Sequence, residues 1–194
     1  MPRAALLLVM LAWAGDADAA QIESFQISHD GDRYRIEVHA RLAVPAGAAY
    51  RAFADPALLQ AINPAVQRVE VLRRVDDHSA RLYSEVHVCA GPFCKTLHQE
   101  QDMSYHPRAA GGEMHGEMLA GVGDFRSGHG DWQFQPVGAE ATELHFVADL
   151  EPSFWVPPLI GPWVVESAFR GEAERTSEGI ERVVRAQAAE AAKQ

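Results

Sequence analysis

Near its C-terminal end the chain reads PWVVESAFRGEAERTSEGIERVVRAQ from residue 162 to residue 187. A stripe of mostly apolar positions recurs there about every 3.6 residues, the period of an α-helix. The stripe consists of Val165, Phe169, Ala173, Thr176, Ile180, Val184 and Gln187. Charged residues such as Glu166, Arg170 and Glu181 fill the other face, so the segment is predicted to be a long amphipathic helix that packs against the rest of the chain.

Upstream of this helix the sequence alternates with a period of two. Between residues 33 and 44, Tyr34, Ile36 and Val38 share one face while charged or polar residues such as Glu37 and His39 share the other. This pattern is typical of a strand with one buried face. Six further strands are predicted between turn-forming residues, at about residues 66–75, 80–89, 93–105, 112–120, 125–136 and 140–150.

Two short helices are predicted after the first strand. Pro45 opens an alanine-rich stretch, and Pro is tolerated in the first turn of a helix. Asp55-Pro56 ends that stretch and starts a second short helix, which Asn63-Pro64 ends. The expected α+β fold is a seven-stranded antiparallel sheet that covers its apolar face by curling around the C-terminal helix. Such curling leaves a gap between sheet and helix in which a ligand can sit.

Three stretches of the chain resemble the START-like helix-grip superfamily (SRPBCC), especially its polyketide cyclase/dehydrase and coenzyme-Q-binding branch. They carry the motifs Val44-Pro45-Ala46, Asn63-Pro64 and Val69-Glu70-Val71-Leu72, then Gly123-Asp124-Phe125-Arg126 and Gly130-Asp131-Trp132-Gln133-Phe134, and finally the proline-broken entry to the last helix. The resemblance implies a protein with a cavity for lipids, quinones, sterols, hormones or polyketides. Only some members of the superfamily perform chemistry, so the fold does not decide the function.

The composition of the 194 residues fits one globular domain, with 47% hydrophobic and 23% charged residues. The formal net charge is −10, and the sequence contains no run of lysines or arginines. Phosphate backbones attract basic surfaces, so no nucleic-acid partner is expected. Any contact with an anionic membrane has to be hydrophobic for the same reason.

The first residues have the pattern of a signal peptide. Arg3 precedes an apolar stretch over residues 4–14, and Ala17 and Ala19 satisfy the small-x-small rule for cleavage. The apolar stretch is shorter than the roughly 20 residues that span a bilayer. We expect residues 1–19 to be removed, a ligand-binding domain over residues 20–194, and a periplasmic or secreted location. A buried N-terminal helix is the alternative.

The two cysteines flank a Gly91-Pro92 turn signal between two predicted strands. In an oxidising compartment, Cys89 and Cys94 are expected to form a disulfide that staples the end of a hairpin. The alternatives are two free thiols, or redox or metal chemistry, although the sequence has no Cys-x-x-Cys beside a helix start.

Alternation along each predicted strand assigns its side chains to the inner or the outer face of the sheet. The side chains predicted to bind the ligand are Val86, Val88, Leu97, Met103, Met114, Met118, Arg126, Trp132, Phe134, Phe146, Trp155 and Phe169. The methionine side chains either pack in the hydrophobic core or form a cavity wall that adapts to different ligands. The inward polar residues, Ser84, Lys95, Gln99, Gln101 and Arg126, either reach solvent near strand ends or meet the polar head of the ligand.

The histidines of the predicted strands fall on the outer face of the sheet. They are His39, His87, His98, His115, His129 and His145. Adjacent strands can place two or three of them within reach of one metal ion, but no pair has the spacing His-x-His or His-x3-His. A solvated polar face is therefore expected, with no metal and no other cofactor.

The sequence lacks the motifs of common enzymes: it contains no Gly-x-Ser-x-Gly, phosphate loop or His-Glu-x-x-His. The leading prediction is an exported carrier or binding protein for a hydrophobic small molecule (lipid, quinone, sterol or polyketide-like) that performs no chemistry. One alternative is a cyclase- or dehydratase-like enzyme for an aromatic or polyketide compound, with Arg126 or Lys95 as its acid or base. The other is a protein-binding module that uses the outer sheet face.

The segment before the last helix is unusually apolar for a loop, with Phe154, Trp155 and Trp163 among its side chains. Packing over the mouth of the cavity is expected. The functional alternative is a gate that also touches a membrane or a partner, with a transient membrane contact through Phe154–Trp163, because aromatic side chains suit such interfaces.

Overall fold

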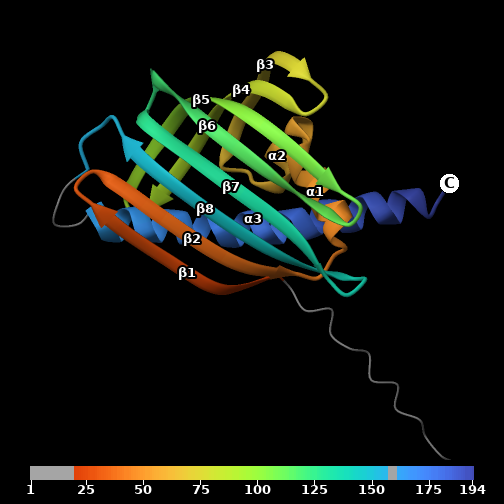
Figure 1. Cartoon of the computed structure of the whole chain (residues 1–194). Coiled ribbons are helices and arrows are strands. Elements are labelled where there is room, and N and C mark those ends of the chain that lie inside the picture. Colours follow the sequence, from red (N-terminus) through yellow and green to blue (C-terminus); the bar gives the residue numbers. More distant parts are fainter. Residues whose placement is uncertain (1–19, 157–160) are drawn as a thin grey trace, which may run out of the picture.

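The computed structural model describes residues 20–156 and 161–194 of the chain (Figure 1). The predicted signal peptide, residues 1–19, and residues 157–160 of the proline-rich loop lie outside the described residues. The elements are, in chain order, β1 (Gln21–Asp30), β2 (Arg33–Leu42), α1 (Ala46–Ala54), η1 (Pro56–Leu58), α2 (Leu59–Ile62), β3 (Val66–Asp76), β4 (Ser79–Ala90), β5 (Phe93–Arg108), β6 (Gly111–Gly123), β7 (Phe125–Val137), β8 (Ala141–Pro152) and α3 (Gly161–Ala191).

All eight strands belong to one antiparallel sheet with the order β1-β2-β8-β7-β6-β5-β4-β3. The sheet curls around α3, which contacts β1 and β2 towards one edge and β4 towards the other. Figure 1 shows α3 running along one side of the curled sheet, with its C-terminal end projecting beyond the strands. The predicted α+β helix-grip fold, with a long C-terminal helix and two short helices, is confirmed.

The predicted number of seven strands is wrong, because β1 precedes the first predicted strand. The apolar residues Ile22, Phe25 and Ile27 of β1 do not keep a period of two. A register shift between Ile22 and Ser24 in the pairing with β2 accounts for this, since a bulge inserts one extra residue and moves the alternation by one position. The strand also lies at the sheet edge, where most of its side chains are partly or fully exposed.

The two short helices cover one end of the sheet. The Pro45 carbonyl accepts hydrogen bonds from the amides of Ala48 and Ala49 at the start of α1. Asp55 ends α1, and its carboxylate accepts the Ala57 amide at 3.0 Å, which caps the turn that leads to α2. Since α1 packs over β6 and β7, it fills this end of the space inside the sheet with apolar side chains.

The C-terminal half of α3 packs tightly in the core, where Ile180, Val183 and Val184 are buried. Glu181 is also buried, with 2% of its surface exposed, although its position predicted a solvent-facing side chain. Its carboxylate accepts the Ala43 amide at 2.5 Å and pairs with Arg185 at 2.9 Å, so a backbone group and a cation satisfy the buried charge. No helix among the described residues has the length and hydrophobicity needed to cross a bilayer.

Candidate ligand-binding cavity

Three chambers lie between the curled sheet and α3. We name them the mouth chamber, of about 290 Å³, the middle chamber, of about 220 Å³, and the inner chamber, of about 210 Å³. The mouth and middle chambers share Leu97 and Ala168, and the middle and inner chambers share Trp132 and Phe146. Because Phe169 borders all three, the chambers adjoin, and together they fall within the 300–1,000 Å³ or so that small-molecule sites occupy.

The mouth chamber has an almost entirely apolar wall, built from the sheet, from the start of α3 and from the segment before it. Among its described lining residues Lys95 is the only charged side chain. The Lys95 ammonium lies 2.9 Å from Asp124 and 4.6 Å from the centre of the Phe154 ring. Burial raises the pKa of Asp124, but the His98 amide and the Lys95 ammonium lower it by more, so Asp124 stays ionised and holds the lysine.

The wall shared by the middle and inner chambers is aromatic. Trp132 of β7 pairs in register with Phe146 of β8, and their ring centres lie 5.1 Å apart. Gly130 is required beside them, since a Cβ at this position would lie only 2.8 Å from the Trp132 ring. The missing side chain lets the indole lie over its own strand and keeps space open between the sheet and α3.

A band of polar side chains crosses the middle chamber. Gln99 and Gln101 point into it from β5, and Asn63 and Glu172 border it from the end of α2 and from α3. The Asn63 side-chain amide donates to the Glu172 carboxylate at 2.8 Å and to Thr176 at 2.9 Å. These groups can hydrogen-bond a polar group on a ligand whose body is apolar.

The structure brings eight of the twelve predicted ligand-binding side chains to the chamber walls. They are Val86, Val88, Leu97, Met118, Trp132, Phe146, Trp155 and Phe169. Met103, Met114 and Phe134 also face inward, but they pack in the core cluster beneath α1 and border none of the three chambers. Alternation along a strand predicts which face of the sheet a side chain occupies. It does not predict whether that side chain lies next to open space or packs in the core.

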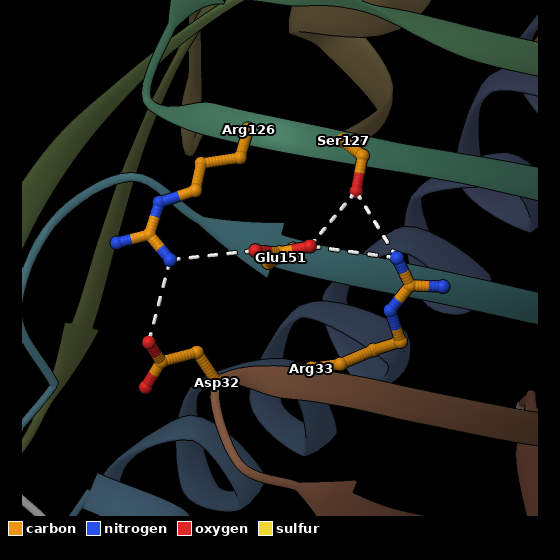
Figure 2. A network of polar contacts seen from close by, with 5 residues as sticks. All are labelled: Asp32, Arg33, Arg126, Ser127 and Glu151. Carbon is orange, nitrogen blue, oxygen red and sulfur yellow. Dashed lines mark hydrogen bonds and ion pairs between the residues drawn. The ribbon is translucent and has the colours of Figure 1, made fainter.

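The predicted inward orientation of Arg126 is wrong. The pairing of β7 with β8 shifts register between Phe125 and Ser127, so Arg126 is the extra residue of a bulge and Phe125 faces the mouth chamber instead. Figure 2 shows Arg126 on the outside of the sheet beside Glu151, with Asp32 on its other side. The distances from its guanidinium to Glu151 and Asp32 are both 3.3 Å.

Side chains from β2, β7 and β8 form the network around Glu151. Its carboxylate also accepts the Ser127 hydroxyl at 3.2 Å and lies 3.4 Å from the Arg33 guanidinium. The hydrogen bond from Arg126 is the largest cause of the lowered pKa of Glu151. Arg126 thus joins the β1–β2 turn to β7 and β8 and makes no contact with the cavity that would fit a ligand-binding role.

Several wall residues were not predicted as part of the site. Ala168 borders both the mouth and the middle chamber, although it lies outside the predicted apolar stripe of the helix. A helical projection places Ala168 on the same face as Val165 and Phe169. The sequence therefore contained a signal that could have identified Ala168. The pairing of Asn63 with Glu172 joins residues 109 positions apart and has no local signal.

The predicted disulfide forms between Cys89 and Cys94, which pair directly across β4 and β5. It staples the hairpin end beside the mouth chamber, where Phe93 is half-exposed. Trp155, which borders the same chamber, is 76% exposed, and Trp163 at the start of α3 is 58% exposed. Large apolar side chains therefore project into solvent from the segments that border the mouth.

Known proteins share this architecture. The Zhui aromatase/cyclase from Streptomyces sp. R1128 superposes with a TM-score of 0.65 and 16% identity, over 79% of this chain and 94% of that one. The STAR-related lipid transfer protein from Xanthomonas axonopodis gives a TM-score of 0.57 and 13% identity, over 83% and 98% of the two chains. A START superfamily protein from Mycobacterium smegmatis gives 0.59 and 18%, over 79% and 98%. At these identities the likeness establishes the fold alone.

Sequence comparison is more specific about the family. No curated protein sequence matches the chain significantly. The family model described as polyketide cyclase / dehydrase and lipid transport matches residues 42–175, from the end of β2 to the middle of α3. The matched segment spans most of the sheet and the residues around the cavity. The chain therefore belongs to the polyketide cyclase/dehydrase and lipid transport family.

Proposed function

We propose that the protein is an exported carrier that holds one hydrophobic small molecule between its sheet and α3 and releases it unchanged. The observation that carries the proposal is the series of adjoining chambers lined by apolar side chains. Burial of apolar ligand surface in such a space is favourable by about 25 cal/mol per Å². A hydrophobic molecule needs a carrier to cross an aqueous compartment between two membranes.

The polar band narrows the class of ligand. Glu172 is held by Asn63 and pairs with Arg175, so the middle chamber already contains a satisfied carboxylate. A second carboxylate placed there would meet like charge in a poorly solvated space. The amides of Gln99 and Gln101 can both donate and accept. An apolar molecule with a hydroxyl or carbonyl group, such as a quinone, a sterol or a polyketide-like compound, fits this lining better than a fatty acid anion.

The arrangement of charges favours a carrier over the cyclase- or dehydratase-like enzyme. That alternative assigned acid–base chemistry to Arg126 or Lys95. Arg126 lies outside the cavity in ion pairs with Asp32 and Glu151. Lys95 is engaged by Asp124 at the mouth and lies on an aromatic ring. Arg126 therefore lies out of reach of a molecule held in the chambers, and the Lys95 ammonium is already engaged by a carboxylate at the mouth.

Export rests on the sequence of residues 1–19 and is consistent with the Cys89–Cys94 disulfide, since such bonds persist in oxidising compartments. Ligand exchange is proposed to take place where Phe93, Trp155 and Trp163 project beside the mouth chamber. These side chains can insert into the outer layer of a bilayer without a basic surface to attract it. Residues 157–160 of the same segment lie outside the described residues.

Trp155→Ser is expected to slow the transfer of a fluorescent quinone analogue between donor and acceptor vesicles by about fivefold or more. Its equilibrium affinity for the analogue should stay within about twofold, because the exposed indole contributes more to membrane contact than to the chamber wall. Val75→Ser is the matched control, since Val75 is an exposed apolar residue at the end of β3 that pairs with the start of β4, whereas the mouth chamber borders the other end of β4.

The same assay distinguishes a carrier from an enzyme. The analogue extracted after transfer should have an unchanged mass and an unchanged NMR spectrum, since cyclisation alone leaves the mass the same. Equal transfer rates for the wild type and Trp155→Ser would overturn the membrane contact. A chemically altered analogue would overturn the carrier and favour the cyclase-like alternative.

A further inference from the structure

The outer face of the sheet, opposite the cavity, carries histidines and carboxylates on four neighbouring strands. They alternate with buried residues, as His39 does with Val38 and Ala40 in β2. The pairing of β2 with β8 places His39 directly opposite His145. Glu37, two residues before His39, lies on the same face beside them.

The three side chains converge on one point. The Glu37 Oε1 atom lies 3.4 Å from His39 Nε2 and 3.2 Å from His145 Nε2. All three ligand atoms lie within 4.8 Å of one another. In a tetrahedral zinc site, with bonds of about 2.0–2.2 Å, neighbouring ligand atoms lie about 3.3–3.5 Å apart. The two distances from Glu37, which are hydrogen-bond contacts in the metal-free protein, are close to this spacing.

The surroundings suit a bound cation. The three side chains are each about one-third exposed, at 33%, 34% and 29%, so an ion can enter and keep a water ligand. A Glu143 carboxylate oxygen lies 3.9 Å from Nδ1 of His39, on the opposite side of the ring from Glu37. When Nε2 of His39 binds a metal in place of its contact with Glu37, a carboxylate on this side of the ring can orient the imidazole through Nδ1. The His39 and His145 rings stack with centres 4.1 Å apart, so both imidazoles would have to rotate about their side-chain bonds for their Nε2 atoms to face a shared ion.

We propose that Glu37, His39 and His145 form a zinc site on the outer face of the sheet, with water as the fourth ligand. Two imidazoles and one carboxylate make up a donor set that zinc favours over magnesium or calcium. The ion would link β2 to β8, the pairing that joins the N-terminal hairpin to the rest of the sheet. This site is independent of the proposed carrier function, because its residues border none of the three chambers.

A second group of histidines on the same face offers an internal comparison. His115 lies 2.7 Å from Asp131, and His129 lies 3.5 Å from Asp149. His129 also lies 3.9 Å from Asp131, and His115 lies 3.6 Å from Glu117. In the described part of the chain, however, no three of these residues bring their ligand atoms within 4.8 Å of one another. His115→Ala therefore removes a histidine from the same face without touching the proposed site.

The test is zinc titration of the protein, expressed without a histidine tag and stripped of metal, in competition with a chromophoric chelator. One equivalent of zinc should bind with a Kd of micromolar order or tighter. His39→Ala and His145→Ala should each weaken binding at least about tenfold. They should also abolish the rise in Tm that zinc gives the wild type. His115→Ala should bind zinc within about twofold of the wild type.

Circular dichroism establishes that each variant is folded, and Glu37→Gln, which keeps the shape of the side chain, provides a second variant of the site. Zinc affinity that is unchanged in a folded His145→Ala variant would overturn the proposal. Equal losses in His145→Ala and His115→Ala would also overturn it, by assigning zinc to a diffuse surface. Binding that appears only after reduction would assign it to His87, Cys89 and Cys94, which also cluster closely.

Discussion

Ala168→Phe is expected to weaken the binding of a fluorescent apolar probe on the order of 10- to 100-fold. Ala168 borders both the mouth and the middle chamber from α3, so the added phenyl ring occupies the space through which they adjoin. The variant should stay folded, because phenylalanine costs only about 0.5 kcal/mol more than alanine in a helix and the added ring enters a cavity. Probe fluorescence at equilibrium measures the affinity.

Ser167→Phe is the matched control. Its position precedes Ala168 on the same helix, but the side chain is exposed to solvent and borders none of the three chambers. Its affinity for the probe should remain within about twofold of the wild type. If Ala168→Phe binds the probe as tightly as Ser167→Phe does, the ligand does not occupy these two chambers.

Gly179→Ala is expected to lower the free energy of unfolding by about 3 kcal/mol, although alanine ordinarily stabilises a helix. A Cβ at Gly179 would lie 1.8 Å from the Ile62 carbonyl oxygen and 2.6 Å from its carbon. Both are backbone atoms, so α3 has to move away from the end of α2. Thermal unfolding should show a decrease in Tm of about 6–12 °C for a chain of this size.

Gly171→Ala, on the same helix, should have the opposite effect. Its Cβ would meet only the flexible end of the Arg175 side chain, at 3.4 Å. The gain in helix propensity then dominates, and stability should rise by about 0.5–1 kcal/mol. A Gly179→Ala variant as stable as Gly171→Ala would mean that α3 does not pack on Ile62 as described.

The sequence predicts most of the fold because long strands and a long helix repeat their patterns several times. Seven of the eight strands, both short helices and α3 lie close to their predicted positions. The missed strand β1 and the wrong orientation of Arg126 have the same cause, since in both places a bulge moves the alternation of side chains by one residue. One bulge hides the apolar face of β1, and another turns Arg126 out of the cavity.

The polar part of the cavity is harder to predict. Asn63 has the local pattern of a helix end, and Glu172 and Glu181 have that of a solvated helix face. The fold brings Asn63 to Glu172 and buries Glu181 against the Ala43 amide. Such contacts join residues more than 100 positions apart, and no local period encodes them. For the same reason the cross-strand group of Glu37, His39 and His145 becomes visible only once β2 pairs with β8.

The methionines allow the most direct test of the cavity. Met103, Met114 and Met118 share the inward parity, but only Met118 borders a chamber, while Met103 and Met114 pack in the core beneath α1. The measurement is ¹³C NMR of the methionine methyl groups, assigned by Met→Leu variants, during titration with a short-tailed quinone. The Met118 signal should shift and saturate at one equivalent, while those of Met103 and Met114 move little. A Met118 signal that stays fixed while the quinone binds would contradict the account, because the ligand would then lie outside the space between the sheet and α3.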